Sequence, residues 1–162
     1  SDTHDNIWKL DQALECMQDA DQLIHCGDLC SPFVVKRIGE AAHGRPVHIV
    51  WGNNEGDIRL MCKIATEYPS LYLHGDFADL ELDGIKVGVT HYPEIARPLA
   101  VSGLYQLVCY GHDHVAHESR QGACRILNPG ELMGRLGAST FVILDGESGS
   151  AKRVEVENPH SI

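Results

Sequence analysis

The sequence contains no apolar run long enough to cross a membrane. Its longest uninterrupted apolar stretches, such as 141–144 and 49–51, have the length of a strand, whereas a membrane helix needs about 20 apolar residues. The chain also opens without the basic start and apolar segment that mark a secretory signal peptide. We therefore expect no membrane partner.

Positive charge is scarce as well. The chain carries 13 Lys and Arg against 23 Asp and Glu, so its formal net charge is -10. Such a surface repels a phosphate backbone over most of its area, so extended nucleic acid is not an expected partner. Ten histidines beside this excess of carboxylates point instead to cations.

Cysteine is present, but without the dense spacing of a disulfide-built domain. The six cysteines lie scattered at 16, 26, 30, 62, 109 and 124, so we expect free thiols and a reducing, cytoplasmic location. With 162 residues, 43% hydrophobic and 22% charged, the composition is that of an ordinary globular protein. We expect a single domain over 1–162.

The hydrophobic periodicity changes between the two halves of the chain. In the first half it predicts helices over 5–19, 31–43 and 57–67, and strands over 23–26 and 47–51. In the second half, Asp83-Gly84 marks a hairpin turn between predicted strands 77–82 and 85–90. A short helix after Pro93 precedes predicted strands over 106–110, 124–127, 140–144 and 152–156, with 146–149 as a hairpin loop. This succession indicates the α/β class.

Five polar clusters stand out, and four of them directly follow a predicted strand. They are Asp2 with His4, Gly27-Asp28, Gly52-Asn53-Asn54-Glu55, His91 and Gly111-His112-Asp113-His114. In open α/β sheets ligands bind outside the carboxyl ends of strands, so we expect these clusters to converge. Carboxylates, imidazoles and an amide oxygen suit Mn²⁺, Fe²⁺, Zn²⁺ or Ni²⁺. Seven candidate ligands are about right for two ions that share one carboxylate.

The order of these clusters resembles that of the calcineurin-like metallophosphoesterases. The ordered blocks of that family stand here as Asp2-Thr3-His4, Gly27-Asp28, Gly52-Asn53, His91 and Gly111-His112-Asp113-His114. The short length and Leu127-Asn128-Pro129-Gly130 look most like its compact bacterial and archaeal phosphodiesterase branch. A scaffold subunit of the retromer coat is also similar to that branch. The resemblance implies two packed mixed β-sheets flanked by helices, an α/β/β/α sandwich with the metal site at the C-terminal ends of strands.

The resemblance also implies a role for each residue. The first metal ion would be held by Asp2, His4 and His114, the second by Asn53, His91 and His112, and Asp28 would bridge them. Of these, Asp28, Asn53, His91 and His112 are the expected catalytic residues. The implied cofactors are two divalent ions, manganese first, with nickel, iron, zinc and cobalt as alternatives. For the other histidines (25, 43, 48, 74, 117 and 160) we expect structural or surface roles, and for Cys26 and Cys30 the role of buried small hydrophobes.

The implied function is hydrolysis of phosphodiesters, and of some monoesters, by attack of a metal-bridging hydroxide. The substrate would be a small phosphoester or a nucleotide, so a cyclic-nucleotide phosphodiesterase is not excluded. The chain could also form a homo-oligomer. The alternative is a protein-binding scaffold similar to the retromer subunit, with a vestigial or regulatory metal site. That scaffold departs from the family pattern at a metal-site histidine, whereas every ligand position is filled here, so the enzyme is favoured.

Three features depart from the wider family. Asn54 stands where many members carry a histidine that protonates the leaving group, and an amide cannot act as an acid near neutral pH. Good leaving groups should therefore be favoured. Trp51 replaces an arginine that often precedes the Gly-Asn block. In this fold the Asp-x-His block ends a central strand, so we expect about five to eight residues of β-strand upstream of Ser1.

Overall fold

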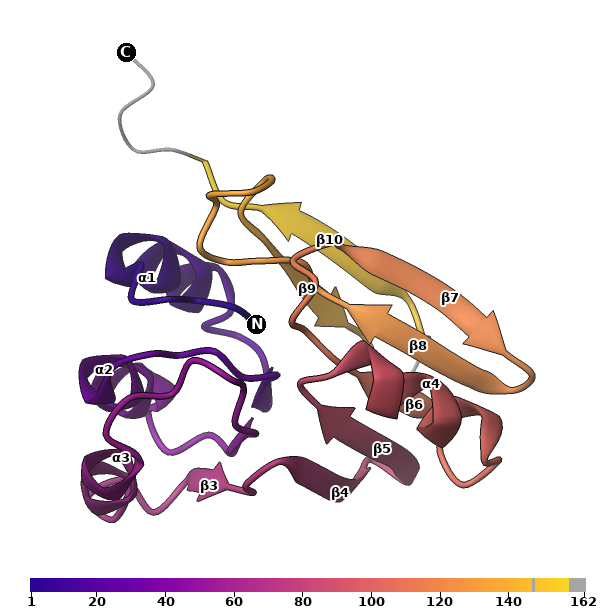
Figure 1. The fold of residues 1–162 in the computed structure, drawn as a ribbon, viewed down its shortest axis with the longest axis horizontal. Coiled ribbons are helices and arrows are strands. Elements are labelled where there is room, and N and C mark those ends of the chain that lie inside the picture. Colours follow the sequence, from indigo (N-terminus) through magenta and orange to yellow (C-terminus); the bar gives the residue numbers. More distant parts are fainter. Residues whose placement is uncertain (147, 158–162) are drawn as a thin grey trace.

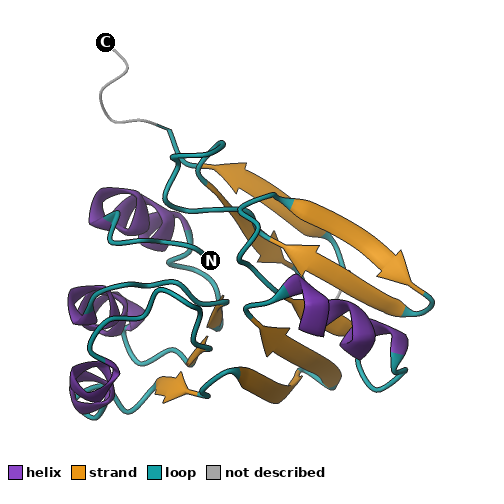
Figure 2. Cartoon of the chain, viewed as in Figure 1, coloured by secondary structure: helices purple, strands orange, loops and turns teal. Residues whose placement is uncertain are grey.

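The computed structural model describes residues 1–146 and 148–157 as an alternation of short strands and helices, followed by a strand-rich half. The helices are α1 (Ile7–Cys16), α2 (Pro32–Ala42), α3 (Ile58–Ala65) and α4 (Pro93–Val101). The strands are β1 (Leu23–His25), β2 (Val47–Ile49), β3 (Leu71–Leu73), β4 (Phe77–Leu82), β5 (Ile85–Thr90), β6 (Leu107–Cys109), β7 (His117–Gln121), β8 (Cys124–Asn128), β9 (Thr140–Leu144) and β10 (Ala151–Glu155). Helices α1, α2 and α3 lie along one side of the molecule and α4 lies on the other (Figures 1 and 2).

The strands of the described residues form three hydrogen-bonded sheets. Strands β1, β2 and β3 are parallel, β9 and β10 form an antiparallel pair, and the largest sheet has the order β4-β5-β6-β8-β7. Within that sheet β5, β6 and β8 are parallel, while β4 and β7 run antiparallel at its edges. The expected α/β class with packed mixed sheets flanked by helices is confirmed.

Three apolar clusters join the layers. The first packs α1, α2 and α3 on β1 and β2, with Leu14, Val35 and Ile49 buried at its centre. The second, which includes Val50, Val87 and Leu127, fills the space between the sheets. The third seats α4 on β6 and β8. Each fully buried aliphatic side chain contributes about 1.5–3 kcal/mol, and together they fix the sheets that carry the polar loops.

Two strands, β3 and β7, were not predicted from the sequence. Strand β3 has three residues, too few to show a period, and it forms only through parallel pairing with β2. Strand β7 is an edge strand whose residues are nearly all exposed and polar, so it has no apolar alternation. Helix α1 is shorter than the predicted 5–19. It begins at Ile7, because Asn6 caps it by accepting a hydrogen bond from the backbone N of Lys9, and it ends at Cys16. Residue 147 of the predicted 146–149 loop lies outside the described residues.

The N-terminal segment lies between the helices and the large sheet (Figure 1). The backbone N–H of Asp2 donates to Gly27 and that of His4 donates to Asp28, so the segment runs beside the loop that follows β1. In the described part of the chain, no helix is both long enough and apolar enough to cross a membrane.

Candidate metal centre

Four of the predicted ligands form a tight group. One ligand atom from each of Asp2, His4, Asp28 and His114 lies within 4.8 Å of every other. Nε2 of His4 is 3.3 Å from Oδ2 of Asp28, and Nε2 of His114 is 3.5 Å from Oδ1 of Asp2. The two imidazole rings stack with centroids 5.1 Å apart. Both carboxylates are buried, whereas both histidines keep partial contact with solvent.

The other three predicted ligands gather beside this group. Oδ1 of Asn53 lies 3.1 Å from Nε2 of His91 and 2.9 Å from Nδ1 of His112. Oδ1 of Asp28 is 3.4 Å from Nε2 of His91. The carboxylate of Asp28 therefore lies between the two groups, and the structure brings all seven predicted residues together.

The backbone at these residues is unusual. Asp2, His4, Asp28, His112 and His114 all have positive φ values, between 42° and 74°. Only a few per cent of non-glycine residues adopt this left-handed region, and each such residue costs free energy that its surroundings must offset. Five such residues around one point make it the candidate functional site.

Two glycines let the loops approach closely. A Cβ atom at Gly52 would lie 2.6 Å from the backbone N of Asp28, and one at Gly111 would lie 2.6 Å from Oδ2 of Asp2. No side chain fits at such distances. The glycine of each motif thus allows the loop to carry its ligand residue up to the carboxylates.

The charge pattern of the site favours a cation. Nδ1 of His91 lies 2.7 Å from the carbonyl oxygen of Cys26 and donates its proton there, so Nε2 presents a lone pair toward the oxygens of Asn53 and Asp28. Nε2 of His4 is buried and makes no hydrogen bond to any described residue. Lone pairs and carboxylates that face one another repel unless a cation lies between them. The donor set therefore fits divalent metal ions.

The pKa values of Asp28 and His91 agree with this charge pattern. Burial opposes ionisation of Asp28, but its contact with His91 and the hydrogen bonds from Asn54 outweigh burial and hold the pKa of this carboxyl well below its usual range. Burial likewise opposes protonation of His91, yet its contacts with Asp28 and Cys26 raise its pKa. Asp28 is thus a carboxylate at any physiological pH.

Glu55 holds the loops that carry two of the ligands. Its Oε1 accepts hydrogen bonds from the backbone N–H groups of Asp28 and Gly52, each 2.8 Å long. Its Oε2 accepts from those of Leu29 and Cys30, at 2.9 and 3.1 Å. Glu55 lies within one of the predicted polar clusters, but the sequence did not indicate its role, because three of its four partners lie 25 to 27 residues away along the chain.

The prediction for the two cysteines beside Asp28 is half wrong. Cys26 is buried, and burial raises the pKa of its thiol to about 12. Cys30 is half-exposed instead, with its Sγ atom 3.4 Å from Nδ1 of His4, because the left-handed turn at Cys30 directs it toward the site. Burial and nearby carboxylates raise the pKa of the Cys30 thiol to about 11, so it stays protonated near neutral pH.

The remaining histidines of the described residues lie outside the cluster of seven. His25 is buried behind it, with Nε2 2.8 Å from Oγ1 of Thr3. His48 and His74 contact each other on β2 and just after β3, with the two ring nitrogens 3.0 Å apart. His43 and His117 are exposed, and His160 lies outside the described residues.

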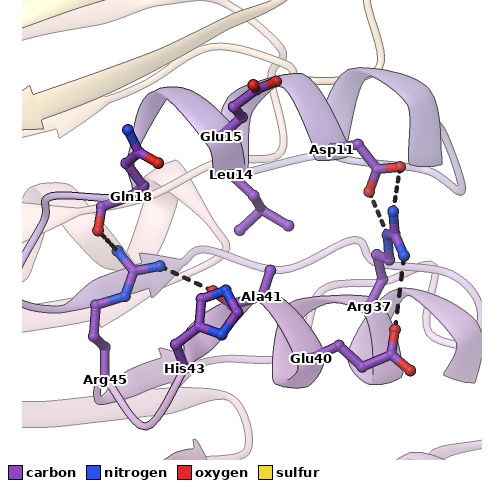
Figure 3. Close-up of a pocket in the computed structure, with 9 residues that line it drawn as sticks. All are labelled: Asp11, Leu14, Glu15, Gln18, Arg37, Glu40, Ala41, His43 and Arg45. Carbon is purple, nitrogen blue, oxygen red and sulfur yellow. Dashed lines mark hydrogen bonds and ion pairs between the residues drawn. The ribbon is translucent and has the colours of Figure 1, made fainter.

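A separate hollow of about 440 Å³ lies between α1 and α2 (Figure 3). Its two arginines are satisfied: Arg37 pairs with Asp11, and Arg45 donates to backbone carbonyls such as that of Gln18. None of the seven candidate ligands lines it. The candidate centre is therefore the cluster around Asp28.

Comparison with known proteins gives a consistent picture. A family model described as "calcineurin-like phosphoesterase superfamily domain" matches residues 1–149. Phosphodiesterase MJ0936 of Methanocaldococcus jannaschii is 31% identical over an alignment of 162 positions, which covers 97% of this chain and 96% of the relative. The solved structure of an archaeal phosphodiesterase matches with a TM-score of 0.87 and 30% identity over 95% of each chain. YfcE, a phosphoesterase from E. coli, matches with a TM-score of 0.68 over 96% of each chain, and its 19% identity supports the fold alone.

Proposed function

The chain belongs to the calcineurin-like phosphoesterase superfamily, and from this premise we propose that it hydrolyses phosphodiesters at a centre of two divalent metal ions. It is a phosphoric ester hydrolase of the metal-dependent kind. The preference for diesters rests on the relatives, which are named as phosphodiesterases. We propose a small phosphoester or a nucleotide as the substrate.

The observation that carries the proposal is the position of Asp28 between two groups of ligands. Its Oδ2 faces His4 and its Oδ1 faces His91, at 3.3 and 3.4 Å. One ion would be held by Asp2, His4, His114 and Asp28, and the other by Asn53, His91, His112 and Asp28. A carboxylate shared by two ions is the usual arrangement of two-metal hydrolases.

Two such ions, when bound, polarise the phosphoryl oxygens and activate water, so that hydroxide is the proposed nucleophile. The residues of this chain hold the geometry in which that reaction occurs. Glu55 fixes the loops of Asp28 and Gly52, and the carbonyl oxygen of Cys26 fixes the ring of His91. Strained, well-tied ligands need little rearrangement during the reaction.

At position 54 the chain has no acid that could protonate the leaving group. Asn54 uses its backbone N–H and its side-chain amide to donate to the two oxygens of Asp28, each at 2.8 Å. Its role is to orient the carboxylate. We therefore propose that substrates with good leaving groups react fastest.

We propose the metal and the compartment from the chemistry of the chain. Carboxylate, amide and imidazole ligands suit manganese, which we propose as the working metal, ahead of nickel, iron, zinc and cobalt. All six cysteines are free thiols. This supports a reducing, cytoplasmic location.

A protein-binding scaffold with a vestigial or regulatory metal site is the alternative. An intact ligand set argues against a vestigial site, because a site that no longer binds metal has no reason to retain five residues in strained left-handed conformations. Activity measurements separate the two functions directly.

The test is hydrolysis of bis-p-nitrophenyl phosphate by the full chain with Mn²⁺. The same assay is run on chelator-treated protein, on a His112→Ala variant and on a His117→Ala variant. His117 is an exposed histidine of β7, outside the cluster, and serves as the matched control.

We expect activity with Mn²⁺ in the wild type and in His117→Ala, and a loss of at least about 100-fold in His112→Ala and in chelator-treated protein. A folded, metal-loaded wild type without activity on any phosphodiester would overturn the proposal and favour the scaffold.

A further inference from the structure

A buried carboxylate outside the predicted ligand set touches the metal cluster. Glu131 follows β8 and Pro129-Gly130, and its side chain is completely buried. Its Oε2 atom lies 2.5 Å from Nδ1 of His114. Its Oε1 accepts hydrogen bonds from the backbone N–H groups of Leu136 and Gly137, at 2.5 and 2.7 Å. A buried carboxylate is costly unless donors satisfy it, and here three donors do.

The contact fixes which nitrogen of His114 carries the proton. An ionised carboxylate can only accept, so Nδ1 of His114 donates to Glu131. In the neutral ring Nε2 then carries the lone pair, and this is the atom that faces Asp2 at 3.5 Å within the cluster of four. The opposite tautomer would turn an N–H group toward a metal ion and prevent coordination.

The segment that begins at Glu131 also holds the backbone of a second ligand. The backbone N–H of Met133 donates to the carbonyl oxygen of Asp2 at 2.9 Å, and that of Leu132 donates to Ser1 at 3.0 Å. The side-chain amide of Asn6 donates to the carbonyl oxygen of Met133 at 2.8 Å. One segment thus ties the ring of His114 and the main chain of Asp2 in a fixed relation.

We propose that Glu131 is a positioning residue of the metal centre, which holds His114 in the Nδ1–H form so that Nε2 is free to bind the first ion. The inference rests on the proposed two-metal function. Carboxylates that orient a metal-binding histidine in this way typically contribute 10–100-fold to metal affinity. The second ion has no ligand in contact with Glu131, so its affinity should be unaffected.

The test uses Glu131→Gln, because glutamine keeps the size of the side chain. Its amide oxygen can still accept from Leu136 and Gly137, which preserves the loop, but its amide NH₂ would face Nδ1 of His114. The ring would then accept at Nδ1 and carry its proton on Nε2. The matched control is Glu81→Gln, an exposed glutamate of β4.

The first readout is titration of metal-free protein with Mn²⁺ by isothermal calorimetry. We expect two ions in the wild type and in Glu81→Gln, and in Glu131→Gln a 10–100-fold weaker affinity for one ion with the other unchanged. Equal affinity for both ions in Glu131→Gln would overturn the inference while leaving the proposed function intact. A wild type that binds no divalent ion would instead overturn the proposed function.

The second readout is the tautomer of His114 in metal-free protein, from nitrogen-15 chemical shifts of the imidazole. We expect the Nδ1–H form in the wild type and the Nε2–H form in Glu131→Gln. A merely structural role of Glu131 would not change the tautomer. Should the variant fail to fold, the wild-type spectrum alone decides, since an Nε2–H form there would overturn the inference.

Discussion

Asn54 holds the carboxylate of Asp28 from both sides, donating its backbone N–H to Oδ1 and its side-chain amide to Oδ2 at 2.8 Å each. Asn54 therefore acts on the proposed bridging ligand. This contact bears on the rate of the reaction, and the contacts of Glu55, His25 and Lys9 bear on stability.

The first prediction concerns the leaving group. Because an amide cannot donate a proton to the departing oxygen, the rate should fall by about tenfold or more when p-nitrophenyl is replaced by phenyl in otherwise equal diesters. The measurement is kcat/KM across a series of aryl diesters at constant Mn²⁺. An Asn54→Ala variant should lose activity on every member by a similar factor. Rates that do not depend on the leaving group would mean that another residue protonates it.

The second prediction concerns Glu55. In Glu55→Gln, an amide NH₂ would replace one of two oxygens that each accept two backbone N–H groups. The loss of hydrogen bonds to a charged acceptor should lower the free energy of unfolding by about 2 kcal/mol. Urea unfolding of metal-free protein measures it, with exposed Glu67→Gln as control. A variant as stable as the control would show that the loops hold their shape without Glu55.

The third prediction concerns pH. Burial lowers the pKa of His25 well below its ordinary value of 6.5, so the folded protein keeps this ring neutral. Below pH 6.5 the unfolded chain takes up a proton there that the folded chain does not, so stability falls as pH falls. His91, whose pKa is raised, acts in the opposite direction, because its contribution is lost as pH rises.

Comparison of the wild type with His25→Gln isolates the effect of His25. Between pH 6 and 5, the stability of the wild type should fall relative to the variant by about 1.4 kcal/mol per pH unit. Urea unfolding at closely spaced pH values measures the difference. A constant difference over this range would mean that His25 accepts a proton in the folded state.

The fourth prediction concerns Lys9, a buried lysine of α1. Its ammonium group donates to the carbonyl oxygens of Val156 and Glu157, at 2.5 and 2.7 Å, and so ties the residues after β10 to the first helix. Lys9→Met should lower the free energy of unfolding by about 2 kcal/mol, because two carbonyls lose a charged donor. Lys36→Met, which removes an exposed pair with Glu40, should cost less than about 0.5 kcal/mol. Equal effects of the two substitutions would contradict the prediction.

Local patterns in the sequence were enough to predict most of the fold. Apolar residues at helical spacing produced α1, α2 and α3, and Asp83-Gly84 marked the turn between β4 and β5. These features depend on residues a few positions apart, so they are visible in the sequence itself. Strands β3 and β7 escaped because their existence depends on pairing with β2 and β8, and neither has an apolar pattern of its own.

The candidate site was likewise only partly predictable from the sequence. Its seven residues were identifiable in the sequence, because four of the five blocks follow a predicted strand and the order of the blocks resembles one family. The residues that position them were not. Glu131 lies 17 residues from His114 and more than a hundred from Asp2, and nothing nearby in the sequence marks it as their partner.

The sequence by itself determined the type of most elements and the ligand chemistry, since these follow from residue identity and short spacings. The class of reaction followed from the resemblance of its ordered motifs to one family. Only the tertiary structure decided the left-handed backbone at five of these residues, the position of Asp28 between two groups and the contact of Glu131 with His114. The physical reason is that these features arise where separate loops meet. The packing of sheets and helices sets their distances, and strain at one loop is offset by hydrogen bonds from another.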